Sequence, residues 1–264
     1  RLAQLALLLP AVLPAQTPPD LAAERAGFAR WLETAPVSPY RAIYHQPFED
    51  ALVMGPGGDL ALAALPAARL EQDLLRLTLE TSDGRRTVPR NRDVEIGGYV
   101  LRVTGERGRS VVTVFGPGRE VAVPGWYAHV PALVVEGTLE PPGRRESRRM
   151  LGLDGIEVEA SLAGTFAGRL GDRPVRLTVY RMPEPGTEES ELMVFFRDST
   201  NGRGTYPAGR FLSLRPLGGN RYRADFNRAR NPFCAYNGIF PCPLPWDGNA
   251  IGVAVNAGER YVEK

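Results

Sequence analysis

Lysine, histidine and cysteine are all scarce in this sequence. Lys264 is the only lysine, so arginine carries nearly all of the positive charge, and its guanidinium suits two-point recognition of carboxylates and phosphates. A GC-rich genome or selection for heat stability would produce the same bias. The formal net charge of +2 is too small to indicate a nucleic-acid partner by itself, so we predict none.

The common catalytic motifs are also absent. The sequence has no GxSxG elbow, no Walker A loop, no HExxH helix and no GxGxxG that follows a strand. This removes the enzymes with those signatures from the leading hypotheses. The two histidines, His45 and His129, each lie beside aromatic or proline residues, where a lone histidine more often packs than acts as a base. We predict no cofactor and no metal site.

No hydrophobic run is long enough to cross a membrane. The run nearest to that length is in residues 1–15, which combine Arg1, a short apolar stretch broken by proline, and Ala15 at a cleavage point. We interpret this segment as a secretory signal, and the alternative is a buried N-terminal helix. The signal predicts an exported protein that is periplasmic, in the cell envelope or secreted. The absence of an Asn-X-Ser/Thr sequon fits a bacterial origin.

Only two cysteines are present, Cys234 and Cys242. Because export would place them in an oxidising compartment, we predict that they form a disulfide. Closing this short loop would contribute about 2.5 kcal/mol in the chain-entropy model. The alternative is a pair of metal-binding thiolates, but no CxxC motif or histidine pair completes a zinc site.

Glycine and proline, in contrast, are abundant. The 29 glycines and 24 prolines favour a turn-rich β protein over a helical one. The sequence predicts a mainly β fold, with antiparallel sandwich-like or barrel-like β regions and one N-terminal helix. We expect that helix over residues 20–35, with Asp20 as N-cap and with Phe28 and Trp31 on the face that docks against the β body.

The pattern divides the chain into successive parts. Residues 1–15 are the signal, residues 16–47 a helix and an extended arm, residues 48–140 a first β region and residues 150–264 a second β region. Residues 141–149, which include four arginines, form an exposed linker between the two β regions. The predicted strands lie at 74–81, 99–104, 110–115, 132–139, 156–162, 175–180, 192–196, 210–214, 221–225 and 250–255.

A polar segment near the C-terminus carries the candidate site. Arg210 and Arg228 offer planar guanidiniums that suit a carboxylate or phosphate, and Asp225 and Glu259 could orient them. Prolines stiffen the loop and lower the entropy cost of binding. The alternative is a structural brace, in which the same residues cap turns and tie down a long loop. The predicted ligand-binding residues are Tyr206, Arg210, Asp225, Asn227, Arg228, Asn231, Asn249 and Glu259.

Three sequence blocks carry a family resemblance. FRDSTNGRGTYPAGRFL, DFNRARNPFCAYNGIFPCPLP and NAIGVAVNAGER, within residues 195–260, resemble the signature of the bacterial and archaeal family catalogued as domain of unknown function 1684. Looser blocks upstream, FGPGREVAVPGWY and AGTFAGRL, extend the resemblance. Arg230 stands where the family pattern has a tyrosine, so the resemblance implies no essential ring at that position. It implies no activity, substrate or cofactor. Because the cysteines belong to the motif, a metal or redox role stays open.

Three functions are compatible with these residues. The first is binding of a small anionic ligand at the predicted residues. The second is hydrolysis with Asp225 or Glu259 as acid or base, which requires one of these carboxyl groups in a cleft. The third is a structural envelope protein with no ligand. Nothing in the sequence predicts an oligomeric state.

Overall fold

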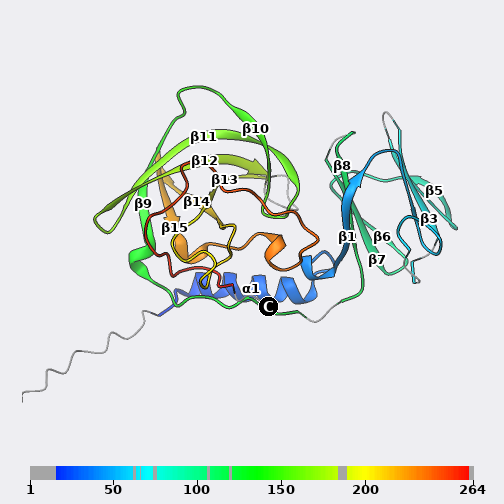
Figure 1. The fold of residues 1–264 in the computed structure, drawn as a ribbon, viewed down its shortest axis with the longest axis horizontal. Coiled ribbons are helices and arrows are strands. Elements are labelled where there is room, and N and C mark those ends of the chain that lie inside the picture. Colours follow the sequence, from blue (N-terminus) through cyan, green and yellow to red (C-terminus); the bar gives the residue numbers. More distant parts are fainter. Residues whose placement is uncertain are drawn as a thin grey trace, which may run out of the picture.

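The computed structural model describes residues 16–61, 64–65, 67–73, 76–105, 108–118, 121–183 and 189–261. The predicted signal, residues 1–15, lies outside the described residues. Figure 1 shows two β assemblies side by side, with one α-helix running along the larger of them. Both assemblies are antiparallel, so the predicted mainly β class is confirmed. Among the described residues, no helix combines the length and the apolar character that a membrane crossing requires.

The smaller assembly consists of two four-stranded sheets that share one core. One sheet has the order β1 (Ala42–Phe48), β8 (Ser110–Phe115), β7 (Tyr99–Thr104) and β6 (Asp93–Ile96), and the other β2 (Ala51–Met54), β3 (Ala68–Gln72), β4 (Leu77–Thr81) and β5 (Gly84–Thr87). The core forms because buried apolar residues alternate with more exposed residues along the strands. Leu70 and Leu79, for example, face each other in register and are both fully buried. The first two residues of the strand predicted at 74–81 lie outside the described residues.

The larger assembly is a six-stranded barrel with one flanking strand. Its strands are β9 (Val134–Glu140), β11 (Glu157–Leu170), β12 (Arg173–Pro183), β13 (Ser190–Phe196), β14 (Arg210–Gly218) and β15 (Arg221–Asp225), and β10 (Ser147–Leu151) flanks β11. β9 closes the barrel by pairing with β15 and with β11. Glycines permit this close approach. A Cβ atom at Gly137 would lie 2.2 Å from the carbonyl oxygen of Ala167, and one at Gly164 would lie 2.0 Å from that of Glu140.

The pairing of β9 corrects the predicted boundary between the β regions. Residues 132–139 do not end the first region, because β9 pairs with barrel strands. Residues 141–146 therefore connect β9 to β10 within one sheet rather than two separate β regions, and residues 147–149 already belong to β10. The predicted strand 99–104 and its partner 110–115, in contrast, are confirmed at both ends.

The strand predicted at residues 250–255 is also wrong. This segment makes a single bridge between Arg197 and Ala250 and is otherwise irregular. Its apolar side chains enter the barrel core instead, where Ile251 and Val255 are buried. An apolar run can therefore reflect a buried irregular segment that fills the end of a barrel.

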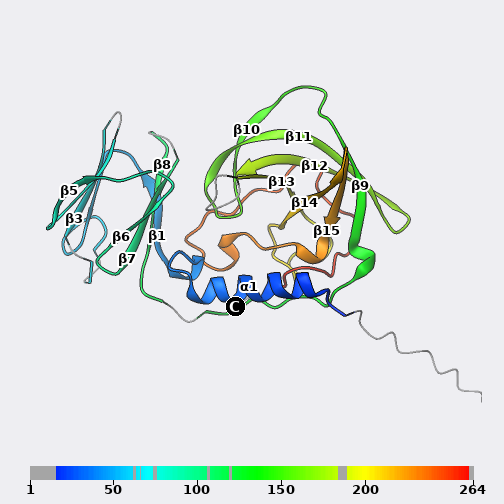
Figure 2. The ribbon, with the colours of Figure 1, turned by 180° about the vertical axis from the view of Figure 1, so that it is seen from behind.

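The helix α1 (Pro19–Thr34) confirms the predicted helix within one residue. It lies along the barrel in both views (Figures 1 and 2). Its docking face is the predicted one, because the Phe28 ring contacts the rings of Trp31, Trp126 and Tyr236 at centroid distances of 5.9, 6.4 and 6.3 Å. Asp20 is not the N-cap, since Pro18 occupies that position and Asp20 lies in the first turn.

Candidate functional site

Arg210 is fully buried at the start of β14. Its Nη2 atom lies 2.8 Å from Asp198 Oδ2 and 2.9 Å from the carbonyl oxygen of Val255, and Nη1 donates to the carbonyl of Ala257. Burial lowers the pKa of Arg210, and the carboxylate of Asp198 opposes that shift. Arg210 therefore fixes the C-terminal segment to the barrel, which favours the bracing role over a ligand contact.

Glu259 is a fully buried carboxyl group. Its Oε2 atom accepts a hydrogen bond of 2.8 Å from the backbone N–H of Asn231, and Oε1 accepts one of 2.5 Å from the hydroxyl of Tyr236. Burial raises the pKa of Glu259 to about 7, although both hydrogen bonds favour the carboxylate. The Asn231 side chain donates to the carbonyl of Arg260 at 3.2 Å. These contacts join the loop after residue 230 to the end of the chain.

The two remaining asparagines of the predicted site bind backbone groups. Asn227 accepts from the N–H of Val130 at 2.8 Å and donates to its carbonyl at 3.1 Å. Asn249 accepts from the N–H of Thr178 at 2.7 Å and donates to two strand carbonyls. Asp225 accepts from the backbone N–H of Asn227 at 3.0 Å. Each amide therefore satisfies the backbone of a neighbouring segment, as buried polar groups require.

Cys234 and Cys242 are free thiols that are not at disulfide distance, so the structure does not have the predicted disulfide. The hydroxyl of Tyr206 lies between them, 3.2 Å from each sulfur. Burial raises the pKa of Tyr206, and burial together with hydrogen bonding to Cys242 raises the pKa of Cys234 to about 12. Among the described residues, no group of three or more His, Cys, Asp or Glu side chains could hold a metal ion.

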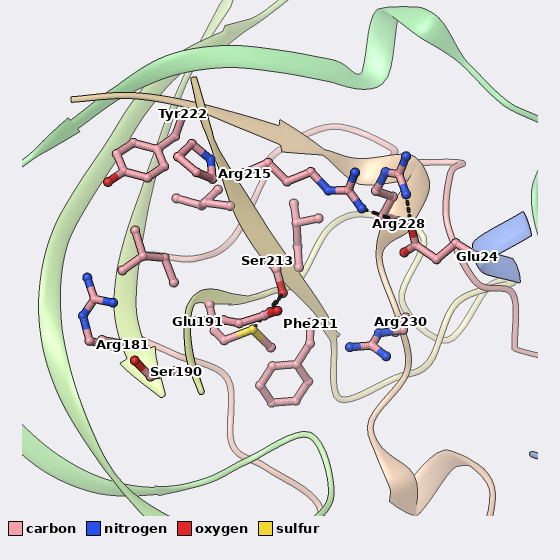
Figure 3. A pocket seen from close by; sticks show the side chains of 15 residues that line it. Glu24, Arg181, Ser190, Glu191, Phe211, Ser213, Arg215, Tyr222, Arg228 and Arg230 are labelled. Atoms are coloured by element: carbon pink, nitrogen blue, oxygen red, sulfur yellow. Dashed lines mark hydrogen bonds and ion pairs between the residues drawn. The ribbon is translucent and has the colours of Figure 1, made fainter. Parts of the chain in front are cut away.

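A cleft of about 570 Å³ opens beside the barrel wall. The pairing of β13 with β14 ends at Met193 and Ser213, and residues beyond this point on both strands line the cleft. Figure 3 shows the side chains around it, which come from four strands, α1 and the loop after β15. Its lining residues are Glu24, Arg181, Ser190, Glu191, Leu192, Met193, Phe211, Leu212, Ser213, Leu214, Arg215, Pro216, Tyr222, Arg228 and Arg230.

Four arginines and two glutamates line the cleft. Arg228 is held by ion pairs with Asp20 and Glu24 of α1 and by its Nε atom, 3.1 Å from Asp225 Oδ2. Arg215 Nη2 lies 3.0 Å from the same Glu24 carboxylate. With Asp20 and Asp225 included, the acidic groups in and beside the cleft equal the arginines in number, so the attraction for an anion is strongest beside an arginine that none of them pairs.

Arg181 differs from the other arginines of the cleft. Its guanidinium is exposed and makes no hydrogen bond or ion pair with any described residue. Figure 3 shows it beside Ser190, on the side of the cleft away from Arg228 and Glu24. An exposed guanidinium without a protein partner is available to a carboxylate or phosphate.

Of the eight residues predicted for the ligand site, only Arg228 lines this cleft. The sequence reasoning missed Arg181 and Arg215 because each lies one residue beyond a predicted strand, 175–180 and 210–214, where the alternation gave it no assigned face. The signal that could have found them is the repeated occurrence of arginine in β12, in β14 and in the segment after β15. That signal becomes specific only when the strands are known to be neighbours.

Comparison with known proteins identifies a family but no activity. A family model described as "Protein of unknown function (DUF1684)" matches residues 124–260. An uncharacterised protein of Haloarcula marismortui, with a solution NMR structure, is 33% identical over a match that covers 53% of this chain and 76% of that protein, with a TM-score of 0.46. None of the curated proteins compared with the chain is significantly similar.

Proposed function

Since this chain belongs to the family described as Protein of unknown function (DUF1684), we propose a function from its cleft. The protein binds a small molecule that has an anionic group and an apolar part. The observation that carries this proposal is Arg181, an unpartnered guanidinium among the described residues, in a cleft lined by three further arginines. The proposal keeps the predicted ligand class and moves the site, with Arg228 as the shared residue.

The size and lining of the cleft support an amphipathic ligand. A volume of about 570 Å³ falls within the range of small-molecule sites. Phe211 and Met193, together with leucines of β13 and β14, supply the apolar part of its lining. An apolar ligand body would cover this surface, while arginine would pair with its charged group.

Ser213 and Glu191 supply a polar point near the centre of the cleft. The Ser213 hydroxyl donates a hydrogen bond to Glu191, and both residues line the cleft. A ligand hydroxyl or amide could exchange with this pair, whereas a second anion beside Glu191 would be repelled. The arrangement therefore favours one anionic end and a neutral body.

A hydrolase that uses Asp225 or Glu259 has less support. Neither residue lines the cleft. Glu259 is enclosed by its hydrogen bonds to Tyr236 and Asn231, and Asp225 is paired with Arg228. General acid or base catalysis requires contact with the substrate, directly or through one water. A purely structural role is supported for the buried polar residues of the signature, but it leaves the arginine-lined cleft without an explanation.

Export of the protein is part of the proposal. It is supported by the basic start and short apolar run of residues 1–15. A ligand-binding protein outside the cytoplasm would meet small anions from the surroundings or from the cell envelope. Expression of the full gene with a C-terminal epitope, followed by fractionation, tests the location. Recovery of uncleaved protein in the cytoplasm would refute export without affecting the cleft.

Binding is tested with four competitors that share one alkyl chain and differ in charge. The protein is first loaded with anilinonaphthalenesulfonate, a dye whose fluorescence rises in apolar sites. Octanoate, octyl phosphate, octanol or octylamine is then added, and the fall in fluorescence measures displacement of the dye. We expect both anions to compete well and the amine to compete poorly. Arg181→Gln should weaken octanoate binding by about tenfold, which corresponds to about 1.4 kcal/mol.

The matched control is Arg145→Gln, which removes the same charge from an exposed position outside the cleft. It should leave octanoate affinity unchanged, because a distant surface charge is screened. Equal loss in both variants would show that only net charge matters. Failure of every anion to displace the dye would refute binding in the cleft.

A further inference from the structure

One end of the cleft is already occupied by a carboxylate of the protein itself. Glu24 Oε2, from the second turn of α1, lies 3.0 Å from Arg215 Nη2 and forms an ion pair with Arg228 Nη1. Two guanidiniums therefore converge on one carboxylate oxygen, and Figure 3 shows this contact at the edge of the cleft. Such convergence is how arginines bind a carboxylate ligand.

The two arginines differ in how firmly they are held. The Arg228 side chain is only 10% exposed, and Asp225 fixes its Nε atom at 3.1 Å independently of Glu24. The side chains of Arg215 and Glu24 are 50% and 44% exposed. Ion pairs between exposed side chains are weak because water and salt compete with them. The contact between Arg215 and Glu24 is therefore the one that an incoming anion can replace.

The helix can stay in place while the Glu24 side chain leaves. Leu21 and Leu32 of α1 are buried, and Arg25 of the same helix donates to the carbonyl oxygens of Tyr127 and Asn227 at 3.1 and 3.0 Å. None of these contacts involves Glu24. Rotation about its side-chain bonds toward solvent would open the arginine pair without any movement of the backbone.

We infer that Glu24 is a built-in competitor for the ligand's anionic group, and that the cleft takes a carboxylate-sized anion by exchanging it for the Glu24 carboxylate. This inference rests on the proposed ligand-binding function and adds its regulation and its preferred head group. The ligand's carboxylate enters between Arg215 and Arg228, and its apolar body extends along the cleft toward Arg181. Arg181 adds to the positive potential that holds the carboxylate in the cleft, so its loss also weakens octanoate binding although it is not the exchange contact.

The experiment compares Glu24→Gln with wild type in the octanoate and octanol competitions described above. Removal of the competing charge should tighten octanoate binding by about fivefold or more, the lower end of typical coupling between two groups. Octanol, which has no charge to exchange, should change by less than about twofold. In the Glu24→Gln background, Arg215→Gln should cancel the gain, because it removes the arginine that was released.

Glu33→Gln is the matched control, since it removes an exposed glutamate from the last turn of the same helix, outside the cleft. It should leave octanoate affinity unchanged. Thermal unfolding of all variants shows whether α1 stays docked, and Glu24→Asp provides a second variant that keeps the charge but shortens its reach. Its affinity for octanoate should lie between wild type and Glu24→Gln.

The outcomes separate the two proposals. If Arg181→Gln weakens octanoate binding while Glu24→Gln leaves it unchanged or weakens it, the cleft binds anions but Glu24 is no competitor. If neither wild type nor Glu24→Gln binds octanoate, both proposals are wrong. Equal tightening of octanol and octanoate would also overturn the exchange, because it would indicate a wider cleft rather than a vacated anion site.

Discussion

Glu259 should make the stability of this protein fall as the pH rises. The carboxyl group is fully buried, and burial raises its pKa from 4.5 to about 7. In the unfolded chain it titrates near its ordinary value, so between these two values the folded state binds more protons. The stabilisation is therefore fully present below about pH 4.5 and is lost as the pH rises through about 7.

The magnitude follows from the difference between the two pKa values. Each pKa unit corresponds to about 1.36 kcal/mol, so the full effect is about 3 kcal/mol, and most of it appears between about pH 5 and pH 8. Glu259→Gln removes the titration. Its carboxamide oxygen can still accept from either the Asn231 N–H or the Tyr236 hydroxyl, the two donors that Glu259 now satisfies.

The assay is urea unfolding of wild type and Glu259→Gln, followed by tryptophan fluorescence at about pH 5, 6, 7 and 8. The difference in free energy of unfolding should shift by about 2 to 3 kcal/mol in favour of the variant over this range. Asp154, whose pKa burial raises to about 6, contributes to both proteins and cancels in the difference. A difference that is independent of pH, or that moves against the variant, would refute the reasoning.

Two further predictions concern the buried residues of the C-terminal signature. Arg210→Met should lower the free energy of unfolding, measured in urea, by about 3 to 5 kcal/mol, because it leaves the buried Asp198 carboxylate without its ion-pair partner. Arg221→Met, which removes an exposed ion pair, should lower it by at most about 1 kcal/mol. Equal losses in the two variants would contradict the bracing role of Arg210. The exposed thiol of Cys242 should react with a thiol reagent in the native protein, and the thiol of Cys234, whose pKa is raised to about 12, only after unfolding. If the two thiols react with the reagent only after the protein has been both unfolded and reduced, the cysteines form a disulfide.

Local sequence patterns predicted most strands but not how they assemble. Alternation located the strands β7, β8, β14 and β15, and these pair with their neighbours in the chain as two hairpins. The same alternation in β9 could not say which sheet it joins. Its partners in the barrel are chosen by long-range packing, and the glycines that allow the approach, Gly137 and Gly164, have no distinguishing local pattern.

For the candidate site, too, the sequence predicted the chemistry of single residues but not how they come together. Residue type alone drew attention to Arg210 and Arg228, since both have the chemistry of an anion site. The structure shows that their surroundings differ. Arg210 donates its hydrogen bonds to Asp198 and to backbone carbonyls, while Arg228 lines the cleft. Arg181 lies just beyond the predicted strand 175–180, and only the end of the β13–β14 pairing reveals a cleft beside it. The polarity of a position can be predicted from sequence, but not its neighbours across the sheet.

The closing strand of the barrel sets the order in which the chain can fold. β9 is the first barrel strand to be synthesised, but one of its partners, β15, is the last, and the paired residues Glu136 and Arg223 are 87 positions apart. Until residues 221–225 are available, β9 exposes an unpaired edge that another chain could join. Contacts of such long range slow folding and extend the lifetime of open intermediates. We therefore expect a chain truncated before β15 to aggregate, whereas in the intact chain β15 pairs with the edge of β9.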